Sequence, residues 1–185
     1  MSGDPVLVPV ARSATILDRA QLTRIEAVHR GFLFQHLCTV QCLLKAAELS
    51  VQSVDVESDE DVEVQFEGRR IYVQVKHRKQ PLAWSDIDEA LARFGELRTA
   101  HGRGERDGEP GFLVVRNVAP NGPLAARIAA AEWPVDVHID WPAADPRTRI
   151  LPAPQASLIE AAEVASQTAG SLLRQSRTGQ AHPAT

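Results

Sequence analysis

Three polar residues in the middle of the chain, Asp61, Gln74 and Lys76, have the types and the spacing from which a divalent-metal site is built. Gln74 and Lys76 lie two positions apart in a run that alternates with apolar residues, and side chains two apart on a β-strand point to the same face. Asp61 leads an earlier alternating run, so a hairpin that joins the two runs would bring its carboxylate to face them.

These residues offer a set of oxygen donors for Mg²⁺. The carboxylate of Asp61, the side-chain carbonyl of Gln74 and the main-chain carbonyl of Val75 are hard ligands, and Mg²⁺ held by few protein groups keeps waters that can act as nucleophiles. Lys76 beside the metal would help to deprotonate the attacking water and would stabilise the charge that builds on a phosphate. The pattern therefore predicts a metal-dependent site that cleaves a phosphodiester.

A simpler interpretation stays open beside this one. An alternating run is also typical of a half-solvated strand whose polar residues only face water, and an acidic turn is most often just a solvated turn. That turn also contains Asp59 and Glu60, so the carboxylate ligand could lie one or two residues from Asp61.

Hydrophobic periodicity predicts the framework that positions these residues. Strands are expected at residues 51–57, 62–66, 71–76, 111–115 and 135–139, and helices at residues 15–29, 32–49, 85–97, 123–133 and 157–175. Gly31 is expected to separate the first two helices, and Ser85 to cap the third, with Asp88 in the capping-box position. The order predicts an α/β fold with a mixed sheet flanked by helices and an extra C-terminal helix.

The second helix carries apolar residues at steps of three and four, which predicts a buried stripe. The stripe consists of Leu33, Leu37, Val40, Leu44 and Ala47. Along the chain we expect a flexible arm at residues 1–14, one domain at residues 15–141, a proline-rich crossing with the last helix at residues 142–175, and a disordered tail or linker at residues 176–185.

Composition limits the class of protein. The chain has 185 residues, of which 44% are hydrophobic and 24% charged, and a net charge of −4, which does not indicate a general polyanion binder. Cys38 and Cys42 fall one helical turn apart in an apolar run, as expected for reduced, packed thiols in a cytoplasmic protein. No segment approaches the roughly 20 apolar residues of a membrane span.

Basic residues nevertheless gather near the predicted site in the sequence. Arg69 and Arg70 lie in the expected hairpin turn, and His77, Arg78 and Lys79 directly follow Lys76. Such groups bind nucleic-acid phosphates without choosing a sequence. Further arginines surround a glycine-rich loop that is expected to be mobile: Arg98, Arg103 and Arg106.

Taken together, these motifs resemble the PD-(D/E)xK restriction-endonuclease-like superfamily, in the branch with Gln in place of Glu. The matching segments are GFLFQ at Gly31–Gln35, ESDED at Glu57–Asp61 and QVKH at Gln74–His77, followed by the segment SDIDEALARF. The resemblance covers roughly residues 28–118. It implies an αβββαβ core, with Asp61 and Gln74 as metal ligands, Lys76 as the catalytic lysine, and Glu57 and Gln35 as supporting polar residues.

The same resemblance implies a Mg²⁺-dependent deoxyribonuclease, with Mn²⁺ as a substitute metal, that cuts double-stranded DNA in a bacterial antiphage or Mrr-like restriction system. It implies a cytoplasmic protein, a homo-oligomer that places two sites on two strands, and a sensor or NTPase module after the domain. Two alternatives remain: a catalytically inactive relative that binds DNA or a partner protein, and an oligomerisation module built on the last helix.

Overall fold

The protein is described here by a computed structural model, which covers residues 18–130 and 132–179. The arm expected at residues 1–14 and residues 180–185 of the expected tail lie outside these ranges. The helices are α1 (Arg19–Leu44), α2 (Ala46–Leu49), α3 (Asp88–Gly102), α4 (Gly122–Ala129) and α5 (Leu158–Gly179), with short 3₁₀ helices η1 (Trp84–Asp86) and η2 (Pro146–Thr148). The strands are β1 (Ser53–Val56), β2 (Val62–Phe66), β3 (Arg69–Lys76), β4 (Glu109–Arg116) and β5 (Val137–Asp140).

The five strands form one mixed sheet in the order β1-β2-β3-β4-β5. The pairs β1–β2 and β2–β3 are antiparallel, whereas β4 runs parallel to β3 and β5 parallel to β4. Gly68 forms the β2–β3 turn with φ +66°, a conformation that glycine adopts without a steric penalty. The predicted α/β class and mixed sheet are confirmed, and β1 and β5 are the edge strands.

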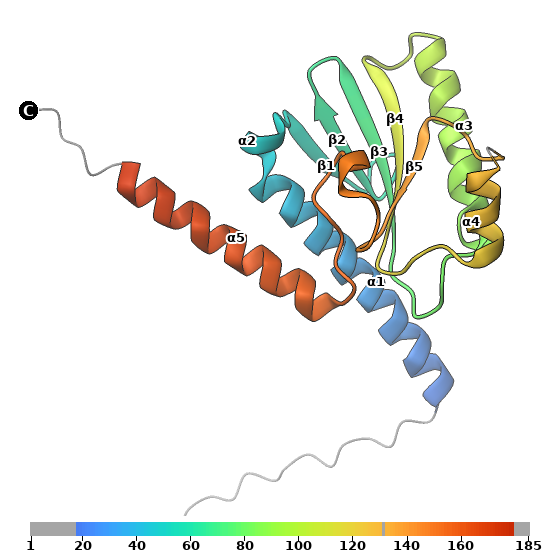
Figure 1. The fold of residues 1–185 in the computed structure, drawn as a ribbon, viewed down its shortest axis with the longest axis horizontal. Helices are drawn as coiled ribbons and strands as arrows, with labels where there is room; N and C mark the ends of the chain where they lie inside the picture. The colour runs from blue at the N-terminus through green and yellow to red at the C-terminus, as the bar shows by residue number, and fades with distance from the viewer. Residues whose placement is uncertain (1–17, 131, 180–185) are drawn as a thin grey trace, which may run out of the picture.

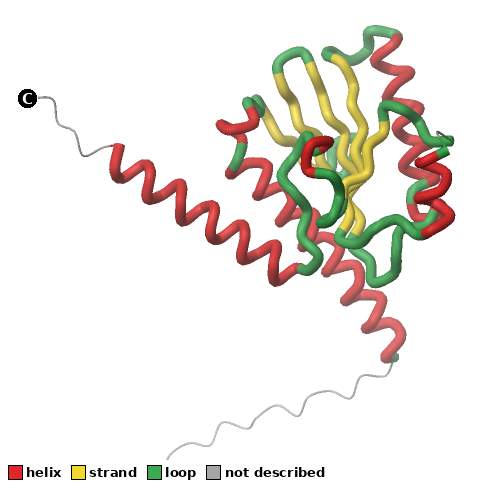
Figure 2. Tube along the Cα trace, viewed as in Figure 1, coloured by secondary structure: helices red, strands yellow, loops and turns green. Residues whose placement is uncertain are grey.

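Helices cover both faces of the sheet (Figure 1). On one face α1 lies against the strands, with α5 beside it, and α3 and α4 cover the other face. The N-terminal part of α1 extends beyond the sheet, as the tube view also shows (Figure 2). Apart from half-buried Leu22, its residues from Arg19 to His29 are exposed to solvent.

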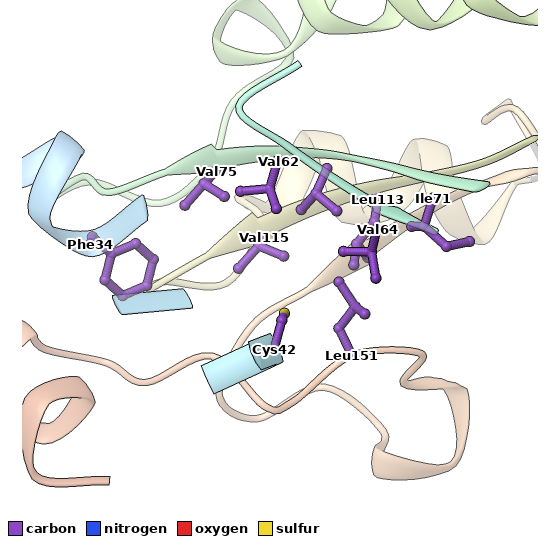
Figure 3. Packing of buried hydrophobic residues seen from close by; sticks show 10 residues of the cluster. Phe34, Cys42, Val62, Val64, Ile71, Val75, Leu113, Val115 and Leu151 are labelled. Carbon is purple, nitrogen blue, oxygen red and sulfur yellow. The ribbon is translucent and has the colours of Figure 1, made fainter. Parts of the chain in front are cut away.

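Two apolar clusters, one on each face, hold the layers together. Under α1, the side chains of Phe34 and Cys42 point toward strand residues such as Val75, and Leu151 closes the cluster from the proline-rich crossing (Figure 3). Under α3 and α4, the cluster includes Tyr72, Ile87, Phe94, Phe112, Val114 and Leu124. Residues of β3 therefore alternate between two cores, which fixes the direction of each side chain.

The structure corrects the two-helix prediction at the N-terminus. Helix α1 runs without a break through Gly31, where an added Cβ would meet no atom within 4 Å, so neither a bend nor a close contact requires glycine. A glycine inside a helix costs only about 1 kcal/mol, less than the stability that a long packed helix gains. The predicted helix 32–49 instead ends at Leu44 and resumes as the short α2.

The predicted buried stripe is also wrong, because α1 turns a different side toward the sheet. Leu33 and Val40 are 50% and 40% exposed, and Ala47 is exposed as well. The buried residues are Phe34, Gln35, Thr39, Gln41 and Cys42. Apolar residues occur around most of this helix, so their spacing did not identify the face that packs, and the buried glutamines are retained by specific hydrogen bonds.

Smaller corrections concern boundaries. Ser85 lies exposed in η1 rather than at an N-cap, and α3 begins only at Asp88, after Ile87. The side chain of Asp86 accepts a hydrogen bond from the Ala83 N–H at 2.8 Å, which closes this turn. Helix α4 ends at Ala129 rather than at residue 133, and α5 continues to Gly179, into the expected tail.

Two further expectations concern thiols and membranes. Burial raises the pKa of both Cys38 and Cys42 to about 12, so both thiols stay protonated and unreactive at neutral pH. Among residues 18–130 and 132–179, no helix combines the length and apolar character that crossing a bilayer requires.

Candidate functional site

The predicted site residues meet at the open end of the β2–β3 hairpin, opposite its turn. Val62 pairs with Val73 in the antiparallel register, so Asp61, one residue before β2, comes opposite Gln74. Gln74 and Lys76 alternate with the buried residues Val73 and Val75. Their side chains therefore project to the face that α3 covers, together with that of Tyr72.

The carboxylate of Asp61 is held by direct contacts at this position. Its Oδ2 atom accepts hydrogen bonds from the Gln74 side-chain amide and from the Val75 N–H, the latter at 2.7 Å. The main-chain carbonyl of Asp61 accepts a further bond from the Gln35 side chain on α1, at 2.9 Å. The structure thus brings together Asp61, Gln74, Val75 and Gln35, four residues of the predicted site.

Glu57 closes the acidic turn that carries Asp61. It adopts φ +54°, an unusual conformation for a residue other than glycine, and its N–H donates to the Asp61 carbonyl at 3.2 Å. The side chain of Glu57 is exposed. The backbone of Glu57 therefore shapes the turn, and Glu57 also lines the acidic hollow described below.

Glu60 is a site residue to which the sequence analysis gave no role beyond an alternative position for the ligand. It is only 9% exposed, and its Oε1 atom has no hydrogen-bond partner among the described residues. Burial, and next the negative charge of Asp61, raise the pKa of Glu60 to about 7, although Arg93 and Lys76 act in the opposite direction. A buried carboxylate without a partner is costly, and its position beside Asp61 makes Glu60 a candidate metal ligand.

Asp59, the other acidic residue considered as a ligand, is already paired. It binds Arg93 at 3.1 Å and Arg106 through a short contact. Arg106 also donates to the hydroxyl of Tyr72 at 3.1 Å, and that hydroxyl lies 2.9 Å from the His101 ring. Asp59 therefore anchors the acidic turn to α3 and to the following loop.

Two hollows of opposite charge meet at these residues. The acidic hollow, about 710 Å³, is lined by six carboxylate residues, which are Glu57, Asp59, Glu60, Asp61, Glu89 and Glu96, together with Gln74, Lys76 and Arg93. The basic hollow, about 650 Å³, lies beneath the projecting part of α1, and its basic residues are Arg24, Arg30, Lys76, His77, Arg78 and Lys79. Asp61, Lys76 and Phe32 line both hollows. The acidic hollow therefore suits a cation, and the basic hollow suits an anion.

Three of the five residues predicted to bind DNA line the basic hollow: His77, Arg78 and Lys79. The backbone of Arg78 is clamped by Asn117, whose side chain accepts from its N–H and donates to its carbonyl, both at 2.8 Å. His77 lies against the ring of Phe34, with a centroid separation of 5.1 Å. The segment that leaves β3 is therefore held in place at the edge of the site.

The structure does not bring Arg69 and Arg70 to the site. They begin β3, seven and six residues before Lys76, and at about 3.3 Å per residue this places them roughly 20 Å away. The side chain of Arg70 forms a 2.6 Å ion pair with Glu63, whose side chain is almost fully buried. These arginines are near Lys76 in the sequence but not in space, because they and Lys76 lie at opposite ends of the extended strand β3.

The arginines at the end of α3 and in the loop after it have other partners as well. Arg98 donates two hydrogen bonds to Asp136, at 2.7 and 2.9 Å, and Arg106 holds Asp59. Arg103 is exposed and lies 3.8 Å from Glu105. Arg106 therefore supports the acidic turn and Arg98 the segment before β5, and none of the three arginines lines the basic hollow.

A Mg²⁺ site at this position would use an amide oxygen in addition to carboxylates. In the described part of the chain, no cluster of three or more His, Cys, Asp or Glu side chains has a metal-binding arrangement. Asp61 and the unpartnered Oε1 of Glu60 provide two carboxylates, and Gln74 provides an amide oxygen once its amide turns over. Mg²⁺ is suited to such a site, since it binds through one or two carboxylates and keeps several waters.

Comparison with protein-family models, with curated proteins and with solved structures found no match.

Proposed function

We propose that this domain is a Mg²⁺-dependent endonuclease of the PD-(D/E)xK type that hydrolyses double-stranded DNA. The observation that carries the proposal is the contact of Asp61 with Gln74 and Val75, beside Lys76, at the junction of an acidic and a basic hollow. The element order from α1 through β1, β2, β3 and α3 to β4 agrees with the αβββαβ core that the sequence motifs imply.

Asp61, Glu60 and Gln74 would hold the metal, with the main-chain carbonyl of Val75 as a further donor. Bound Mg²⁺ would lower the pKa of a coordinated water and neutralise charge on the phosphate. Gln35 and the Glu57 N–H, both bonded to the Asp61 carbonyl, fix the position of the ligand-bearing turn. Such supporting bonds commonly change metal affinity by about 10- to 100-fold.

In the reaction, a water attacks phosphorus while the bond from phosphorus to one ester oxygen breaks. The attacking water loses a proton to solvent, and the departing ester oxygen gains one. Lys76, which lines both hollows, lies where its ammonium group can stabilise the negative charge that develops on the phosphate oxygens. The basic hollow would then hold the DNA backbone and the acidic hollow the cation.

The biological setting follows from the resemblance alone. It is that of a cytoplasmic bacterial defence nuclease, in which a C-terminal sensor or NTPase module controls cutting and a homo-oligomer places two sites on the duplex. A catalytically inactive DNA-binding module is the alternative. The hydrogen bonds that Asp61 accepts are compatible with it, because Gln74 and Val75 already donate to Oδ2 of this carboxylate.

The test is cleavage of supercoiled plasmid in Mg²⁺ or Mn²⁺ by the full chain and by Lys76→Gln. Native protein is expected to nick and linearise the plasmid, and Lys76→Gln to be slower by about 100-fold or more, since it loses a positive charge that acts on the transition state. Lys45→Gln is the matched control, because Lys45 is a partly exposed lysine at the end of α1, paired only with Glu48. Cleavage that Lys76→Gln leaves unchanged would refute the assignment.

A further inference from the structure

The projecting end of α1 is an unexplained feature of the fold. Its residues between Arg19 and His29 pack little against the body of the protein (Figures 1 and 2), although an unsupported helix of this length is only marginally stable in water. Two of its arginines, Arg24 and Arg30, line the basic hollow. Neither was part of the predicted site.

Among residues 18–130 and 132–179, both arginines have only weak partners. Arg24 lies 4.0 Å from Asp18, and Arg30 lies 3.9 Å from Glu26, with every one of these side chains at least 37% exposed. Exposed pairs at such distances contribute little to stability. A phosphate group could therefore replace Asp18 and Glu26 as the partner at small cost.

The opposite wall of the hollow is also basic. Arg78 and Lys79 line it together with Lys76, and among the described residues Asp61 is the only acid in the lining. His77 lies in the same lining. The lining also includes the apolar side chains of Val28 and Phe32, which can pack against deoxyribose.

We propose that the projecting end of α1, from Arg19 to Arg30, is a DNA-binding arm. Arg24 and Arg30 on one wall of the basic hollow, with Arg78 and Lys79 on the other, hold the phosphates of one duplex strand next to the scissile phosphate. The inference rests on the proposed nuclease function and adds to it the path of the substrate. The basic hollow leads to Asp61 and Lys76, because these two residues line both hollows. Backbone contacts of this kind give affinity without sequence choice.

The test is binding of a fluorescent 20-base-pair duplex by the full chain in EDTA, so that no cleavage is needed. The variant is Arg24→Gln/Arg30→Gln, which retains good helix formers on α1. The dissociation constant is expected to rise about tenfold or more, and the slope of its logarithm against the logarithm of salt concentration to fall by about 2, one unit for each lost phosphate contact.

The matched control is Arg103→Gln/Arg147→Gln, which removes two charges from residues that are 68% and 87% exposed and that line neither hollow. Equal losses in the two double variants would overturn the inference, as would unchanged binding by Arg24→Gln/Arg30→Gln. Weakened binding by this variant in a chain that never cleaves DNA would support the arm and refute the nuclease. Cleavage by the native chain, together with unchanged binding by Arg24→Gln/Arg30→Gln, would support the nuclease and refute the arm. Circular dichroism verifies that α1 stays helical.

Discussion

Glu60 supplies a prediction whose size follows from the structure. Its pKa rises from 4.5 to about 7 on folding, mainly because the carboxylate is buried. Each unit of pKa shift corresponds to about 1.4 kcal/mol, so the ionised side chain lowers the free energy of unfolding by up to about 3 kcal/mol. Glu60→Gln removes the charge but preserves the shape, and it should therefore stabilise the metal-free protein at high pH.

The direction with pH is fixed by proton binding. In the unfolded chain Glu60 loses its proton near pH 4.5, whereas in the folded protein it keeps the proton to about pH 7. The folded state thus binds more protons in this window, so this residue makes the free energy of unfolding fall as pH rises from about 4.5 to 7. The advantage of Glu60→Gln should be near zero at pH 4.5 and reach its full value above pH 7.

Urea unfolding at pH 4.5, 6, 7 and 8, in EDTA, measures this difference. Glu67→Gln is the control, because Glu67 is an exposed carboxylate in the β2–β3 turn, far from the site. The reasoning is refuted if Glu60→Gln changes stability by the same amount at every pH, or if it destabilises the protein above pH 7. Either result would mean that the Glu60 carboxylate has a partner that stabilises its charge.

Further predictions concern the same turn. Mn²⁺ affinity, measured by electron paramagnetic resonance, should increase from pH 6 to 8 in the native chain and lose most of this dependence in Glu60→Gln, since the metal must displace the Glu60 proton. Gln35→Ala should weaken Mn²⁺ binding by about tenfold, whereas Gln41→Ala, which removes a buried glutamine bonded to Gln155 instead, should leave the affinity unchanged. Arg106→Ala should lower the free energy of unfolding, measured with urea, by about 1 to 3 kcal/mol, because it leaves the Tyr72 hydroxyl and the Asp59 carboxylate with fewer partners. An unchanged urea midpoint would contradict the anchoring role of Arg106.

The sequence predicted the sheet and the central contact because both depend on local alternation. Val62–Phe66 and Arg69–Lys76 alternate over short runs joined by a glycine turn, so the register follows from the turn, and Asp61 had to come opposite Gln74. The same logic placed Gln74 and Lys76 on one face. These relations need no knowledge of distant parts of the chain.

What the sequence could not predict depends on contacts between distant segments. The roles of Asp59 and Glu60 depend on their surroundings: Arg93 on α3 and Arg106 in the next loop pair with Asp59, whereas Glu60 Oε1 has no partner among the described residues. An i, i+1 pair of acids in a turn gives no signal of this difference. The face of α1 was missed for the same reason, because Gln35 is buried through its bond to Asp61, which is 26 residues away in the sequence.

The central claim is that Asp61, Glu60 and Gln74 converge on one cation. The most direct measurement is the anomalous scattering of a crystal of the full chain soaked in Mn²⁺. We expect a peak within about 2.5 Å of carboxylate oxygens of both Asp61 and Glu60, with the Gln74 amide turned so that its oxygen faces the ion. A soaked crystal with no peak at the junction of the two hollows, and with Asp61 still accepting its hydrogen bond from Gln74, would contradict the account.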